Sequence, residues 1–375
     1  MKRLLVKPSL FLAFPLLISC GAAFVSFDLP HGYLYGWFFL ILVALLILGI
    51  DIMLPIRLPL RIELQQVRFS GHRESITAIL FSWAILAACL VDITLFPIPI
   101  FTDPSLYATF EESRGHVRHI SNMCWILPVV AMLCVRNRMV RAVFIVAGLL
   151  FPVVVLDRNR LFASIYSLMA VLIIRSTRTI NWKHLAVVGL AAVMVFAQLG
   201  KLRSGNLEWL SLPLSPTFRN SPPGMKWVLL YMSAGVYNFS SIWSKGYSDA
   251  SLLICQLLPG SGSVESLYGM IPLDMPTINV GTEYFPFLMA FGPAGVLLAA
   301  LLLFSVLCLS IVLLRSRPTL FSLLIFLRVS YVCIMSGFST QAFTWTTFGF
   351  ILVCLFMMGF SSLLYYTSSR QSHLA

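Results

Sequence analysis

Ten apolar runs, most of them near the length of a bilayer crossing, make up the larger part of this sequence. The chain is 59% hydrophobic and 11% charged, whereas a soluble domain carries about 25% charged residues. The runs are Pro8–Val25, Tyr33–Leu54, Ile76–Phe96, Ile120–Val135, Ala142–Leu156, Leu161–Ile174, Leu185–Gly200, Pro286–Leu314, Leu320–Phe338 and Thr344–Tyr366. We therefore predict an all-α polytopic membrane protein with about ten transmembrane helices, folded as a single membrane domain over residues 1–375.

Short basic clusters separate alternate runs and predict the orientation. They include the segments Arg57–Arg73, Arg136–Arg141 and Arg175–His184, and the pair Arg315 and Arg317. Short loops rich in Lys and Arg stay on the cytoplasmic side of a membrane. Both termini are therefore predicted to be cytoplasmic. The same clustering accounts for the net charge of +12 and argues against a nucleic-acid partner.

No motif predicts a metal or a cofactor. The eight Cys residues lack a CxxC spacing and are expected to pack as small apolar side chains. His116 and His119 are three residues apart, but no further ligand cluster accompanies them. Walker, GxGxxG, GxSxG, HExxH and DxD patterns are also missing from the sequence. These absences disfavour an ATPase, a zinc protease and a cytoplasmic nucleotide-sugar transferase.

The longest polar stretch, Lys201–Phe285, is predicted to form one large outer loop that carries short helices. Within it, Trp227–Trp243 is apolar enough to lie in the membrane surface. Ser233 and Asn238 argue against a full crossing, so we expect an interfacial helix. If this segment did cross, every later loop would change sides.

Four arginines lie at the outer ends of predicted spans and are the first candidates for substrate binding. They are Arg158, Arg160, Arg203 and Arg219. A guanidinium group keeps its charge and binds phosphate oxygens through a bidentate fork. Such a set would hold a lipid diphosphate at the membrane boundary; the alternative is that each contacts solvent or lipid headgroups. A four-residue turn between two spans does not need two arginines, which favours a role for the first pair.

Three charged residues near or inside spans are further candidates. Glu283 is the carboxylate closest to the point where the long loop returns to the membrane, and it is predicted to accept a proton from a sugar hydroxyl. The alternative for Glu283 is an ion pair with a loop arginine. Asp92 and Arg328 lie within spans, where charge is costly. They either pair with each other or face a water-filled cavity.

Several of these segments resemble one family. Asn279–Phe285, followed by Phe291–Val296, resembles the segment through which Wzy-type O-antigen polymerases return to the membrane, with an acidic residue before an aromatic-Gly-x-x-Gly helix start. Arg158–Leu161 looks like the arginine turn of that family. Tyr231–Asn238 is similar to the aromatic-Gly-Asn stretch in its long periplasmic loop.

The resemblance implies an enzyme of the bacterial inner membrane that acts at the periplasmic face. It would join undecaprenyl-diphosphate-linked oligosaccharide repeats, both donor and acceptor, into a surface polysaccharide without a metal or a cofactor. A chain-length regulator would be a further partner, besides the lipid bilayer. The implied roles are catalysis for Glu283, diphosphate binding for Arg158, Arg160, Arg203 and Arg219, and sugar binding for Trp209, Tyr231, Tyr237 and Asn238.

Three other classes of protein compete with a polymerase. An O-antigen ligase would share the fold, but the family resemblance implies a histidine in its long loop, and residues 201–285 contain none. A flippase for lipid-linked sugars would need ionisable groups along many spans, and the spans hold little beyond Asp92 and Arg328. A non-enzymatic scaffold would leave the arginine turn without an explanation.

Overall fold

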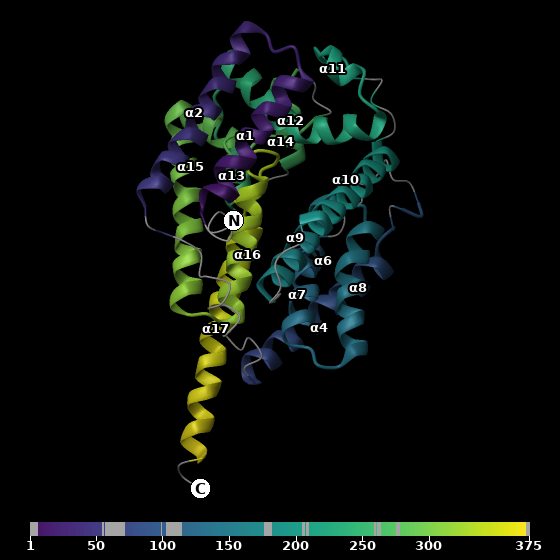
Figure 1. Cartoon of the computed structure of the whole chain (residues 1–375), viewed down its shortest axis with the longest axis vertical. Helices are drawn as coiled ribbons and strands as arrows, with labels where there is room; N and C mark the ends of the chain where they lie inside the picture. The colour runs from purple at the N-terminus through teal and green to yellow at the C-terminus, as the bar shows by residue number, and fades with distance from the viewer. Residues whose placement is uncertain are drawn as a thin grey trace. The chain divides into compact units, whose positions relative to one another are not determined.

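The computed structural model is helical through the part of the chain that it describes (Figure 1). The described residues are 7–54, 56, 72–98, 100–102, 115–175, 182–204, 207, 210–258, 260, 264–274 and 278–372. The chain divides into two compact units. Unit 1 comprises Met1–Pro59, Leu207–Ser316 and Arg328–Ile351, and unit 2 comprises Leu60–Asn206, Arg317–Leu327 and Leu352–Ala375.

All ten predicted runs are helical, because a helix satisfies its backbone polar groups internally, as lipid requires. The corresponding helices are α1 (Ser9–Ser26), α2 (His31–Met53), α4 (His72–Leu95), α6 (Gly115–Ser121) with η3 (Asn122–Trp125) and α7 (Ile126–Leu133), α8 (Arg138–Val154), α9 (Arg158–Arg175), α10 (Trp182–Ser204), α15 (Phe285–Ser316), α16 (Leu320–Met335) and α17 (Trp345–Ser372). Four of them, α1, α2, α4 and α15, are long and apolar enough to cross a membrane. That the other six also cross stays a prediction.

The centre of unit 1 is α12 (Pro223–Lys245), which packs against α1 and α2. Gly36 of α2 comes so close to it that an added Cβ would lie 3.0 Å from the Cα of Ser240. Every residue of α12 from Ser233 to Ile242 is buried. The middle of this helix is enclosed by protein, because its small residues let neighbouring backbones approach from several sides. That the helix lies in the membrane interface stays a prediction.

The rest of the long polar stretch, where it is described, consists of short helices joined by turns and non-helical segments. It forms α11 (Pro216–Arg219), α13 (Ser251–Leu257) and α14 (Val264–Met270), so a loop with short helices describes only part of this stretch. The helix that follows, α15, is broken at Gly292, whose φ of 62° and ψ of −154° are not helical. Pro293 then occupies the first turn of the longer part, a position that suits proline.

Segments that are distant in sequence meet at one end of unit 1. Asp28, in the turn between α1 and α2, donates its backbone N–H to the carbonyl of Pro213 at 2.8 Å. The backbone N–H of Glu283 donates to the carbonyl of Ser336, after α16, at 2.7 Å. These contacts place the α1–α2 turn beside the long stretch, and the end of that stretch beside the α16–α17 connection. The ten-span prediction requires all three segments to be on one side of the membrane.

Reporter fusions test this topology. A reporter inserted at the exposed Asn220, close to Ser215, is expected to be periplasmic, because Ser215 bonds to the end of α1 through the carbonyl of Ser26. A reporter near Ser316, after α15 and beside Arg315 and Arg317, is expected to be cytoplasmic. Alkaline phosphatase and green fluorescent protein fusions measure the two sides. The same side for both positions would refute the ten-span arrangement.

Candidate functional site

The return segment (Asn279–Phe285) is held against the middle of α12 by a side-chain clamp. The amide of Asn238 donates to two backbone carbonyls, that of Ile278 at 2.8 Å and that of Val280 at 2.7 Å. One turn earlier, an added Cβ on Gly235 would lie 3.1 Å from the backbone nitrogen of Thr282. Asn238 is 3% exposed; its bond to Ile278 is buried and its bond to Val280 is partly buried. The structure thus gives Asn238 a backbone-clamping contact instead of an open sugar-binding surface.

Glu283 lies inside unit 1, with 1% of its surface exposed. Its carboxylate accepts backbone N–H bonds from three consecutive residues, Gln341 at 2.6 Å, Ala342 at 2.9 Å and Phe343 at 2.9 Å. Burial raises the pKa of this carboxyl group, and the three N–H donors oppose that rise. The contacts describe an anchor for the segment between α16 and α17. The role of general base stays a prediction.

Arg328 holds the same segment from α16. Its Nε and Nη2 donate to the hydroxyl of Thr347, at 3.2 and 2.8 Å. That hydroxyl donates in turn to the carbonyl of Gln341 at 2.7 Å. The charge on Arg328 also favours the ionised form of Glu283. Arg328 therefore interacts electrostatically with Glu283. Asp92, which was one predicted partner of Arg328, belongs to unit 2.

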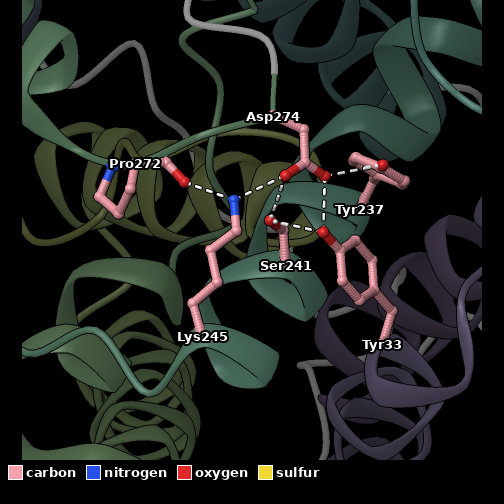
Figure 2. Close-up of polar contacts among 6 residues, drawn as sticks. All are labelled: Tyr33, Tyr237, Ser241, Lys245, Pro272 and Asp274. Atoms are coloured by element: carbon pink, nitrogen blue, oxygen red, sulfur yellow. Dashed lines mark hydrogen bonds and ion pairs between the residues drawn. The ribbon is translucent and has the colours of Figure 1, made fainter.

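A second polar cluster surrounds Asp274 (Figure 2). Its Oδ2 accepts hydrogen bonds from the hydroxyls of Tyr33 at 2.7 Å and Tyr237 at 2.8 Å. Its Oδ1 accepts from Ser241 at 3.2 Å and lies 2.6 Å from the Nζ of Lys245. Four donors fill the lone-pair positions of one carboxylate. These bonds connect the Asp274 segment to α2 and α12, and we call this cluster of Asp274, Tyr33, Tyr237, Ser241 and Lys245 the latch.

The charge at Asp274 is stabilised by these donors. Burial by itself would raise its pKa, but the bonds from Lys245, Tyr33 and Tyr237 outweigh burial and hold the pKa below its ordinary value. Burial and the nearby carboxylate raise the pKa of Tyr237, so its hydroxyl remains a donor. Tyr237 was predicted to bind sugar, and its bond to Asp274 was not predicted. The feature that could have indicated this cluster is the spacing of Tyr237, Ser241 and Lys245, which lie four residues apart on one helix face.

Replacing Asp274 with Asn is expected to lower the stability of unit 1 by about 1–2 kcal/mol, because an amide nitrogen cannot accept a hydroxyl proton. The matched control is Asp28→Asn at an exposed position. Because the folded-state pKa of Asp274 is depressed, its contribution is present above about pH 4 and is lost as the pH falls through that pKa. Thermal unfolding of both variants in detergent measures this. Equal melting of Asp274→Asn and wild type at neutral pH would contradict the latch.

In unit 2, the turn before the arginine pair is strained and capped. Leu156 has a φ of 56°, a left-handed conformation that is rare for a residue other than Gly. The N–H of Leu156 donates to the carbonyl of Val153, and the N–H of Asp157 donates to the carbonyl of Pro152. These two bonds form the Schellman pattern that ends a helix. The Oδ1 of Asp157 then accepts the N–H of Arg160 at 3.0 Å and caps α9. The turn therefore fixes the direction of the first residues of α9.

The two arginines of this turn have different surroundings. Arg160 is 5% exposed; its Nε lies 2.7 Å from the Oδ2 of Asp157, and its Nη1 is 3.5 Å from the hydroxyl of Ser121. That hydroxyl donates to Asp92 at 2.8 Å, which gives the carboxylate within α4 a partner. Arg158, the first residue of α9, is half-buried. Arg160 thus belongs to an internal network, and Arg158 is the more exposed of the two.

The other predicted site residues are spread over the chain. Arg219 is exposed at the end of α11 in unit 1, whereas Arg158 and Arg160 belong to unit 2. Tyr231 is half-buried on α12. Trp209 and the side chain of Arg203 lie outside the described residues. All eight Cys are buried and none forms a disulfide, as expected for packing residues.

Comparisons of the chain with family models, with curated proteins and with solved structures found no match. The fold itself defines a helical protein whose longest apolar helices are suited to a membrane. Among the described residues, no group of three or more His, Cys, Asp or Glu could hold a metal ion.

Proposed function

We propose that this protein is an inner-membrane polymerase that joins undecaprenyl-diphosphate-linked oligosaccharide repeats at the periplasmic face. The observation that carries the proposal is the contact between two segments that separately resemble the Wzy-type family. Asn238, at the end of the aromatic-Gly-Asn stretch, binds the backbone of Ile278, just before the return segment, and of Val280 within it. Two motifs about forty residues apart in sequence are therefore in direct contact, as they would have to be if both belonged to one site.

In the proposed reaction, a hydroxyl oxygen of one repeat attacks the anomeric carbon of the growing chain. The bond between that carbon and the diphosphate oxygen breaks, and the lipid diphosphate leaves with the electron pair. Arg158 would stabilise the charge that develops on the diphosphate, as guanidinium groups do for phosphoryl oxygens. Arg219 and Arg203 are further candidates for this role.

The attacking hydroxyl must also lose its proton. Glu283 is the predicted base, but three backbone N–H groups already bind its carboxylate. If these bonds persist with substrate present, the proton has a second destination in an oxygen of the departing diphosphate. Burial raises the pKa of Glu283, whereas the three N–H donors and the charge on Arg328 favour its ionised form, which suits both a base and an anchor.

The decisive experiment is a gel of surface lipopolysaccharide from cells that lack this protein. A polymerase predicts loss of the ladder with core plus one repeat retained, and recovery of the ladder when the gene is restored. Bare core with free lipid-linked polymer would instead identify a ligase. Repeats that stay on the cytoplasmic side would identify a flippase. An unchanged ladder would refute all three.

A further inference from the structure

The link between α16 and α17 (Ser336–Thr344) is fixed from several directions. Glu283 binds three of its backbone N–H groups, and the amide of Gln256 on α13 donates to the hydroxyl of Thr340 at 3.2 Å. Tyr268 on α14 also bonds to Thr340. Gly337 is so close to α1 that an added Cβ would overlap the hydroxyl of Ser19. Figure 1 shows the link beside α13 and α14. A segment held in this way is pre-organised.

The residues where the link meets α17 present an aromatic ring and hydroxyl groups to the outside. Trp345 is 47% exposed. The hydroxyls of Thr344 and Thr346, one on each side of it, are 3.0 Å apart at an exposed position. Thr344 is held by a bond to the carbonyl of Gln341 at 2.9 Å. The arginine of this region, Arg328, donates to Thr347 instead.

A ring face flanked by fixed hydroxyls suits a neutral sugar, which offers an apolar face of C–H groups and a rim of hydroxyls. A diphosphate would need cationic donors at the same place. We infer that Trp345, Thr344 and Thr346 form a sugar subsite for the oligosaccharide part of the substrate. This inference rests on the proposed function. It replaces Tyr237 and Asn238 as sugar contacts, since both of those side chains are buried and engaged.

Exposed aromatic residues at helix ends also occur simply because they favour the membrane interface. Tyr35, the fifth residue of α2, is such a residue and is 72% exposed. It provides a matched control, because loss of an interfacial ring affects both positions equally. Loss of a sugar contact affects Trp345 alone. Thr346→Val provides a second variant, because it removes one exposed hydroxyl and keeps the size of the side chain.

The test measures sugar binding by the purified full chain in detergent. The probe is the repeat oligosaccharide released by mild acid from the lipid-linked pool of the producing cells, followed by saturation-transfer NMR. Trp345→Ala is expected to weaken binding about tenfold or more, as truncation of a central Trp commonly does. Thr346→Val should weaken it several-fold, and Trp345→Phe should retain part of the affinity. Tyr35→Ala should bind like the wild type.

Thermal melting of each variant verifies that the fold is intact. If the wild type binds the oligosaccharide and both Trp345→Ala and Thr346→Val bind equally well, the subsite is refuted while the polymerase proposal stands. No binding by the wild type would also refute the subsite. In either case the lipopolysaccharide gel of the deletion strain decides the proposed function independently.

Discussion

Cells that carry Glu283→Ala should accumulate little folded protein. The change leaves three N–H groups without the Glu283 acceptor, those of Ala342 and Phe343, which are buried, and that of Gln341, which is partly buried. Each unsatisfied buried donor costs about 1–3 kcal/mol, so we expect a loss of at least 3–5 kcal/mol. That is a large part of the total stability of a typical domain, about 5–15 kcal/mol. Size-exclusion profiles and thermal melting in detergent measure the loss.

Gln341→Ala is the matched control for this experiment. It removes the side-chain bond from Gln341 to Ser339 but keeps the backbone N–H that Glu283 accepts. It should therefore melt close to the wild type. Normal accumulation and melting of Glu283→Ala would refute the anchoring role.

Glu283→Gln separates the anchor from the base. A glutamine retains one acceptor oxygen and has the same shape, so part of the anchoring persists. If Glu283 acts as the base, this variant keeps its fold and the binding of lipid-linked donor but loses turnover. If Glu283 is only an anchor, activity falls no further than the amount of folded protein. Turnover per folded molecule is thus the quantity that decides between the two roles.

The second large effect is expected at the α8–α9 turn, where two neighbouring arginines should behave differently. Arg158→Ala should abolish long polymer while core plus one repeat and the protein level persist, because its guanidinium group is predicted to bind the diphosphate. Arg160→Ala should lower the protein level instead. It removes the guanidinium group that pairs with the buried carboxylate of Asp157, at a cost of up to about 3–5 kcal/mol. Lipopolysaccharide gels and immunoblots of the same cultures measure both quantities.

Arg138→Ala is the control for Arg158→Ala. Arg138 is the first residue of α8, as Arg158 is of α9, and a side chain of the preceding residue caps each helix. Arg138 is exposed and lies in a segment predicted to be cytoplasmic. Its replacement should leave the polymer unchanged. A normal ladder for Arg158→Ala would remove Arg158 from the site, and a normal level of Arg160→Ala would refute its structural role.

The helices and their approximate bounds followed from the sequence alone. Apolar runs such as Tyr33–Leu54 and Pro286–Leu314 predict helices because a chain in lipid must bond its backbone locally. The helix start at Pro293 fits proline, whose fixed φ suits a first helical turn, and the positive φ of Gly292 before it is one that glycine tolerates. Helix formation and helix starts can be predicted because they depend mainly on residues that are close together in the sequence.

Only the tertiary structure decided which way the polar side chains point. The interactions of Glu283 with Gln341, and of Asn238 with Val280, join residues 58 and 42 positions apart. No local pattern specifies such pairs, because they form only when helices pack and exclude water from the groups between them. The sequence thus determined that charged and amide groups occur near the return segment. Packing determined that these groups bind the backbone, because an N–H group or a carboxylate that is buried away from water needs a hydrogen-bond partner within the protein.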